Sequence, residues 1–168
     1  MEVIKSDIEG LLILKPKVFG DERGYFFESY NEEVYRKAGI DYLFLQDNIS
    51  KSKKGTIRGL HYQVGEKAQG KLCKVIYGKV LDVAVDIRFG SPTFGKYFSS
   101  ELSEDNHTQL WIPPGFAHGF SVLSDEAIFS YKCTALYSKE NERAILYNDK
   151  DLNINWKVDN TIVSDKDL

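Results

Sequence analysis

The sequence predicts an all-β protein built as a β-sandwich or a jelly-roll barrel. Three observations support this fold class. Short runs of alternating apolar and polar residues dominate the chain, turn signals recur at intervals of roughly ten residues, and only one helix is clearly signalled. With 168 residues and no internal repeat or linker, the chain is expected to form a single domain over residues 1–168.

Two apolar stretches near the N-terminus are expected to be the opening strands. They are Val3–Ile4 and Leu11–Leu14, and Lys15-Pro16 ends the second one. The glycines and charges of Phe19–Gly24 indicate a turn. Tyr25–Tyr30 is rich in aromatic residues and is therefore expected to be a strand.

One helix follows this strand. Asn31 can cap its first turn, where Glu32-Glu33 suit the positive end of the helix dipole. Arg36-Lys37 suit the negative end, and Gly39 provides the exit. The sequence therefore predicts a short helix between Asn31 and Gly39.

The most regular strand pattern lies at Leu81–Ile87. Aliphatic residues at every second position alternate with Asp82, Ala84 and Asp86, which predicts a strand with one apolar face. The two aspartates are expected to face solvent or to bond within turns. Gly78 marks the hairpin turn before this strand.

The later strands contain two candidate site residues. Gly115–Gly119 is expected to be a tight loop around His118 that leads into a strand at Phe120–Leu123. Alternation over Ala127–Cys133 puts Tyr131 on an otherwise apolar face, so its ring should point into the barrel. A structural tyrosine is the ordinary interpretation there, and His118 is equally consistent with binding and with structure.

Composition excludes several classes of protein. A net charge of −3 offers no basic field for nucleic acid. No apolar run approaches the roughly 20 residues of a membrane span, and no signal peptide is evident, so a cytoplasmic protein is expected. Cys73 and Cys133 lie in apolar runs without metal or redox spacing and are expected to be buried thiols.

The candidate chemistry centres on the stretch Arg58–Gln63, which contains His61. An imidazole near Arg58 and Lys71 suggests a site that binds anions and moves a proton, although a structural histidine is the alternative. Strict alternation puts Arg58 and His61 on opposite strand faces, so both can line one site only if Gly59 marks a bulge or a bend.

The remaining histidines and acids carry weaker signals. His107 follows Asp105-Asn106 and is expected to be solvated, and Asp165 and Asp167 look by composition like a charged tail. A histidine-based metal site is a rival for any barrel of this kind. No His-x-His pair is present and the three histidines are far apart in sequence, so no metal is expected.

Taken together, the motifs closely resemble those of the dTDP-4-dehydrorhamnose 3,5-epimerase family. The resemblance runs from about residue 10 to the C-terminus. Its motifs are Phe19–Glu28, Gln46–Asn48, Arg58–Gln63, Gln69–Lys71, Asp82–Arg88, Gly90–Gly95, Leu110–Phe120, Tyr131-Lys132 and Ile154–Trp156. It implies a cupin-like jelly-roll barrel with short flanking helices, used as a homodimer without metal or cofactor.

The resemblance also implies catalytic roles. His61 would remove the protons at C3 and C5 of dTDP-4-dehydro-6-deoxy-D-glucose, and Asp167 would orient the imidazole. This role reverses the interpretation of Asp167 as part of a tail. Lys71 would stabilise the enolate, and Tyr131 would return a proton from the opposite face, which gives the dTDP-4-dehydro-L-rhamnose product.

Substrate binding is implied in the same way. Arg23 and Glu28 would contact the nucleotide from a neighbouring subunit, so the homodimer would complete each site. Tyr137 would stack on thymine, and His118 would bind the sugar or a phosphate. The other positions implied to bind substrate are Gln46, Asn48, Arg58, Glu142 and Lys166.

Three alternatives share much of this pattern. An epimerase acting at C3 or C5 alone would use the same His61, Lys71 and Tyr131. A sugar-nucleotide 3,4-ketoisomerase fits the motifs less well. A binding module without activity would not need an acid–base pair, so the presence of His61, Lys71, Tyr131 and Asp167 favours an enzyme.

Overall fold

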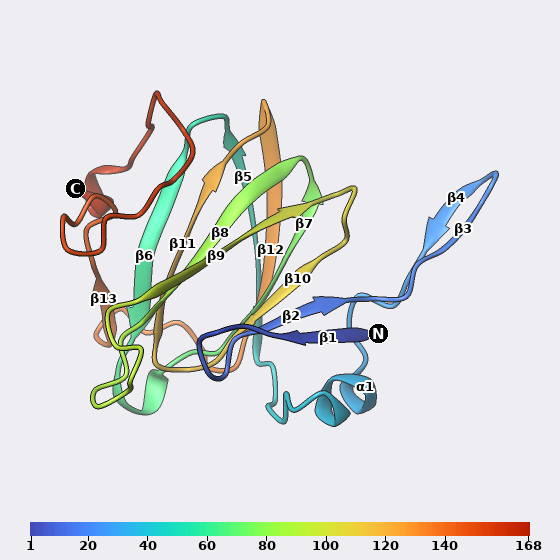
Figure 1. Cartoon of the computed structure of the whole chain (residues 1–168), viewed down its shortest axis with the longest axis horizontal. Coiled ribbons are helices and arrows are strands. Elements are labelled where there is room, and N and C mark those ends of the chain that lie inside the picture. Colours follow the sequence, from blue (N-terminus) through green and yellow to red (C-terminus); the bar gives the residue numbers. More distant parts are fainter.

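The structure, a computed structural model, describes residues 1–168 and consists mainly of two antiparallel sheets (Figure 1). The larger sheet has the strand order β1-β2-β10-β7-β12-β5. Its strands are β1 (Glu2–Lys5), β2 (Leu12–Lys15), β10 (Gln109–Ile112), β7 (Lys71–Tyr77), β12 (Glu126–Cys133) and β5 (Gln46–Lys53). Gln46 and Asn48 lie two positions apart on β5, and both line the interior cavity described below.

The smaller sheet has the order β13-β6-β11-β8-β9. Its strands are β13 (Glu142–Ala144), β6 (Ile57–Gln63), β11 (Phe116–Val122), β8 (Lys79–Asp86) and β9 (Tyr97–Ser103). Every neighbouring pair in both sheets is antiparallel. The predicted all-β architecture is therefore confirmed.

The main core fills the space between the two sheets. Phe129 of β12 and Phe120 of β11 come from opposite sheets, and their rings stack with centroids 4.2 Å apart. Burial of such aromatic and aliphatic side chains is the main stabilising contribution to a fold of this kind. Cys73 and Cys133 are buried free thiols, as predicted, and burial raises the pKa of Cys133 to about 11.

A second apolar layer covers the outer face of the smaller sheet. Leu81, Val83 and Val85 of β8 pack there against Trp156 and other residues of the C-terminal segment. Strand β8 is therefore buried on both faces, and the predicted solvent face is wrong. Asp82 and Asp86, which occupy that face, have no exposed surface. The alternative expectation, bonding within a turn, is confirmed for Asp86, which accepts hydrogen bonds from Ser91 and Thr93.

The predicted helix forms as α1 (Glu32–Lys37). The Asn31 side chain accepts a hydrogen bond from the Val34 amide, and both charged turns are arranged as expected. The helix covers the outer face of the larger sheet, where Tyr35 packs in a cluster with Leu14 and Trp111. Two short 3-10 helices, η1 (Gly65–Lys67) and η2 (Asp165–Asp167), complete the chain.

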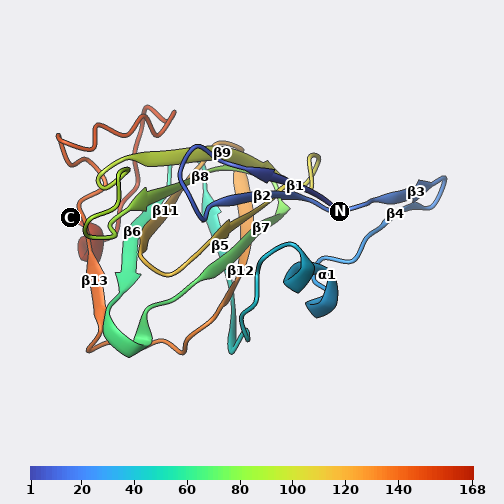
Figure 2. The same ribbon diagram turned by 60° about the horizontal axis from the view of Figure 1, so that its bottom comes forward.

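A hairpin projects away from the two sheets. It consists of β3 (Phe19–Asp21) and β4 (Gly24–Phe26), and both views show it far from the C-terminal segment (Figures 1 and 2). Its side chains Phe19 and Phe26 are 55% and 68% exposed. Behind the hairpin, His107 packs against Tyr25 and Phe27, with ring centroids 4.6 and 5.0 Å away, and is only partly solvated. None of the helices is long and apolar enough to span a membrane.

Candidate active site

A cavity of about 320 Å³ opens between the two sheets beside the core. Side chains of β5, β7 and β12 line it from the larger sheet, and side chains of β6 and β11 line it from the smaller one. All the predicted site residues line this cavity except Arg23 and Glu28. Those that line it are Gln46, Asn48, Arg58, His61, Lys71, His118, Tyr131, Tyr137, Glu142, Lys166 and Asp167.

His61 and Asp167 form a direct pair although they lie 106 positions apart in the chain. The distance between His61 Nε2 and Asp167 Oδ1 is 2.5 Å, and Asp167 Oδ2 also accepts a weak bond from the Gly59 amide. The Asp167 side chain is 4% exposed, whereas that of His61 is 28% exposed. The tail expected from composition is therefore wrong at Asp167, because η2 folds back against β6.

Gly59 brings Arg58 and His61 to the same cavity. The pairing of β6 with β11 shifts register here, since Arg58 is opposite Phe120 but His61 is opposite His118. Three steps along β6 thus match two along β11, which is the predicted bulge. Gly59 has a φ of +128°, and a Cβ there would lie 2.5 Å from Gly119 Cα, so only glycine fits without a shift.

Lys71 and Tyr131 face the cavity from the opposite sheet to His61. The Lys71 ammonium lies 5.7 Å from the centre of the Tyr131 ring and makes no ion pair. Burial lowers the pKa of Lys71, while nearby thiols and carboxylates act in the opposite direction. Burial raises the pKa of Tyr131, so its phenol is protonated near neutral pH.

A connected set of hydrogen bonds fixes the rim of the cavity. The Tyr137 amide donates to Gln46 Oε1 at 2.9 Å, and the Tyr137 hydroxyl donates to Glu142 at 2.8 Å. Glu142 also pairs with Lys166. Burial would raise the pKa of Glu142, but the bonds from Lys166 and Tyr137 outweigh this effect and lower it. The Tyr137 ring is thereby held at both ends beside the opening.

Two serines of β5 take part in the site although no sequence motif singled them out. The Arg58 Nε donates to Ser52 Oγ at 2.9 Å, which orients the guanidinium. The Ser50 hydroxyl lines the cavity and has no protein partner. Gln46 and Asn48 lie two positions apart on β5, and the same spacing continues to Ser50 and Ser52, so this period-two pattern was the signal that could have found the two serines.

His118 forms a second pair with a carboxylate below the cavity floor. Its Nε2 lies 2.5 Å from Asp82 Oδ1, and both residues are buried. The sequence interpretation missed Asp82 because it assumed a solvent face. Cys73 adds a third potential ligand, and the three ligand atoms lie within 4.8 Å of one another, which makes this cluster the one place where a metal could bind.

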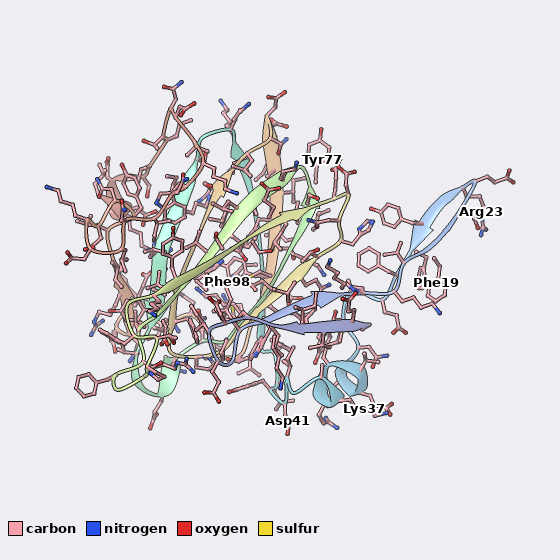
Figure 3. The ribbon with its side chains drawn as sticks, in the orientation of Figure 1. Phe19, Arg23, Lys37, Asp41, Tyr77 and Phe98 are labelled. Carbon is pink, nitrogen blue, oxygen red and sulfur yellow. The ribbon has the colours of Figure 1, made fainter.

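Arg23 and Glu28 lie apart from the cavity within one chain. Arg23 sits at the tip of the projecting hairpin, where its side chain pairs only with Asp21 (Figure 3). Glu28 lies near the base of the hairpin, beside Phe26 and Val34. A single chain therefore does not bring these two residues to the other predicted binding residues.

Comparison with known proteins agrees with this geometry. The profile of the family described as dTDP-4-dehydrorhamnose 3,5-epimerase matches residues 5–168. A curated relative of that name from Shigella flexneri is 59% identical over 169 residues, covering 100% of this chain and 93% of the relative.

Solved structures of the same family superpose closely on this one. The dTDP-4-dehydrorhamnose 3,5-epimerase from Elizabethkingia anophelis has a TM-score of 0.94 at 50% identity, covering 99% of this chain and 93% of that chain. An epimerase from Legionella pneumophila, solved in complex with dTDP-4-keto-L-rhamnose, has a TM-score of 0.95 at 50% identity, covering 99% of this chain and 89% of that chain. The fold is accordingly the cupin-like jelly roll of these enzymes, and the chain belongs to the dTDP-4-dehydrorhamnose 3,5-epimerase family.

Proposed function

We propose that His61 and Tyr131 act as the base and the acid of a two-centre epimerisation. The reaction converts dTDP-4-dehydro-6-deoxy-D-glucose to dTDP-4-dehydro-L-rhamnose by inverting C3 and C5, in dTDP-L-rhamnose biosynthesis. The observation that carries this proposal is that His61 and Tyr131 line one cavity from opposite sheets. An epimerase needs a base on one face of the sugar and an acid on the other.

The first half of each inversion is removal of a proton. The C4 ketone acidifies the hydrogens on C3 and C5, and the His61 imidazole accepts one of them. Asp167, bonded to the imidazole at 2.5 Å, stabilises the imidazolium that results. The electron pair moves to O4 as an enolate, which the ammonium of Lys71 stabilises.

The second half is return of a proton to the other face. Tyr131 donates its phenolic proton to the carbanion carbon, and the enolate returns to the ketone. The phenolate is then reprotonated from solvent and the His61 imidazolium releases its proton to solvent, which resets both groups for the second carbon. The raised pKa of Tyr131 supports its role as a proton donor. Because the ketone already supplies the electron sink, the proposed mechanism uses neither metal nor cofactor.

The nucleotide is proposed to bind across the rim. Tyr137 stacks on the thymine, while Gln46, Asn48 and Arg58 bind the base and the diphosphate, and Glu142 and Lys166 hold the rim. His118 contacts the sugar from the floor.

The rest of the nucleotide site is proposed to come from a second copy of the chain. The projecting hairpin supports a homodimer in which Arg23 and Glu28 of one chain complete the site of the other. Residues 1–168 then act as one catalytic domain, in the cytoplasm where nucleotide sugars are made.

Proton exchange in deuterium oxide tests this function. The purified protein is incubated with dTDP-4-dehydro-6-deoxy-D-glucose in deuterium oxide, and the sugar protons are followed by NMR. The expected result is deuterium at both C3 and C5, with an L-rhamno product trapped by a downstream reductase. A heat-inactivated sample controls for spontaneous exchange next to the ketone.

Two other results would contradict the proposal. Label at one carbon only would identify an epimerase of a single centre. No label from folded protein that still binds dTDP would identify a binding module and remove the catalytic roles of His61 and Tyr131.

A further inference from the structure

The pair of His118 and Asp82 differs in its surroundings from the pair of His61 and Asp167. His118 lies on β11 and Asp82 on the neighbouring β8, and the two residues are 5% and 0% exposed. Their contact, His118 Nε2 to Asp82 Oδ1 at 2.5 Å, is shielded from solvent. An aspartate can only accept here, so His118 Nε2 carries the hydrogen.

The other ring nitrogen of His118 is free of the protein. Nδ1 bonds to no protein group, and it is not among the buried side-chain atoms that lack a partner, so it reaches the cavity that His118 lines. Burial lowers the pKa of His118, and Lys71 and His61 add to this effect while Asp82 opposes it. The imidazole is therefore neutral, and its Nδ1 carries a lone pair that faces the cavity.

We propose that Asp82 is a positioning residue that holds His118 in the Nε2–H tautomer, so that Nδ1 accepts a hydrogen bond from a hydroxyl group of the sugar. This inference rests on the proposed function. The C4 ketone has no hydrogen to donate, which leaves the hydroxyls at C2 and C3 as partners. A contact at either position would fix the rotation of the sugar ring between His61 and Tyr131.

The surroundings of Asp82 support a role beyond stability. Its Oδ2 is buried without any nitrogen or oxygen partner, the neighbouring Cys73 thiol is only a weak donor, and Asp82 makes no ion pair with a lysine or an arginine. A buried carboxylate with an unsatisfied oxygen destabilises a fold, and an apolar residue of similar size would serve the core better. In the proposed role, the charge of Asp82 is useful because it selects one tautomer of His118.

Metal binding accounts less well for the same cluster. Nitrogen and oxygen ligands of a tetrahedral metal lie about 3.3 Å apart, because each is about 2.0–2.1 Å from the ion. His118 Nε2 and Asp82 Oδ1 are closer than this and have the separation of a hydrogen-bonded pair. Cys73 Sγ, 3.8 Å from Nε2, fills the space beside the pair.

The decisive measurement is the tautomer of His118 in the wild-type protein. Nitrogen-15 NMR of histidine-labelled enzyme, assigned with a His118→Gln variant, is expected to show Nε2 protonated and Nδ1 unprotonated at pH 7. A protonated Nδ1 in the wild-type protein would overturn the proposal. This readout does not require turnover, so failure of the proposed function would appear separately, as absence of epimerisation by the wild-type enzyme.

Kinetics of Asp82→Asn give the second test. The variant is expected to shift the His118 tautomer toward Nδ1–H and to lower kcat/KM about 100-fold, while its affinity for dTDP, which lacks the hexose, stays unchanged. Asp86→Asn is the matched control, since Asp86 is equally buried on the same strand. It should lower stability without changing kcat/KM. Equal loss of dTDP binding and turnover in Asp82→Asn would show a purely structural role and contradict the inference.

Discussion

At the scale of single residues, the roles proposed for His61 and Asp167 make two separate contributions to proton removal. His61→Asn removes the base, so turnover should fall about 1,000- to 10,000-fold. Asp167→Asn keeps the base but loses the charge that stabilises its imidazolium, so a smaller loss of about 100-fold is expected. Single-turnover kinetics with the dTDP-sugar would measure both values.

Asp165→Asn provides the control for this comparison. Asp165 belongs to the same 3-10 helix but is exposed and contacts no site residue, so turnover should stay at the wild-type level. Equal losses in His61→Asn and Asp167→Asn would show instead that the two residues act as an inseparable unit.

At the scale of the elements, the bulge in β6 depends on Gly59. Gly59→Ala would combine a left-handed backbone with contacts of 2.5 Å to Gly119 Cα and 2.7 Å to the His118 carbonyl oxygen. It should lower the free energy of unfolding by about 3 kcal/mol and reduce turnover, because Arg58 and His61 would move. Urea unfolding and steady-state kinetics would check both effects.

Gly90→Ala measures how much stability is lost from the positive φ alone, without a steric clash. Gly90 also has a positive φ, of +82°, but nothing lies within 4 Å of a Cβ built there. A loss of about 1 kcal/mol with unchanged turnover is expected. Similar results for the two variants would mean that the close approach of β6 and β11 does not determine the geometry of the site.

The loop after β8 should make stability depend on pH through Asp86. Burial would raise the pKa of this carboxyl, but hydrogen bonds from Arg88, Ser91 and Thr93 outweigh burial and hold it well below its usual value. A depressed pKa stabilises the fold above the unfolded value of about 4, and this contribution disappears as pH falls further.

Urea unfolding of Asp86→Asn at two pH values tests this linkage. The variant should be about 3 kcal/mol less stable than the wild type at pH 7, and the difference should shrink at pH 3. Asp125→Asn is the control, because that exposed carboxylate has no side-chain hydrogen bond. A difference that stays constant between pH 7 and pH 3 would contradict the assignment.

Local features of these elements were predictable from sequence, whereas the packing of a distant chain segment over a strand was not. The Asn31 cap and the Gly59 bulge follow from a few neighbouring residues, and both are confirmed. The second apolar layer over β8 is built by Trp156 and its neighbours, far along the chain. Local alternation carries no information about such a distant partner, so Asp82 was assigned to solvent.

Local sequence was equally unable to predict the contact between His61 and Asp167. Composition described Asp167 as part of a charged tail, and only the family resemblance connected it with His61. The contact forms because η2 packs on β6, which is a tertiary interaction between residues 106 positions apart in the chain. Residue type indicated the chemistry at each position, but the three-dimensional arrangement decided which positions meet.

At the scale of the whole molecule, the projecting hairpin is proposed to complete the site of a second chain. Arg23 and Glu28 lie away from the cavity of their own chain, and the hairpin exposes apolar rings that a second copy could cover (Figure 3). Closed homodimers commonly exchange equivalent elements in this way. The activity of mixed dimers can test the proposal directly.

Arg23→Ala and His61→Asn should each be nearly inactive alone but complement each other when unfolded and refolded together. In a mixed dimer, one site receives both mutations and the other receives neither, so about a quarter of the wild-type sites should recover. Size-exclusion chromatography would verify the dimers, and turnover would be compared with that of each variant refolded alone.

Mixing Arg23→Ala with Glu28→Ala is the control. Both mutations lie on or beside the hairpin, so every mixed site keeps one of them and activity should not recover. If Arg23 and His61 acted within one chain, the first mixture would also stay inactive, and the proposal of a shared site would be wrong.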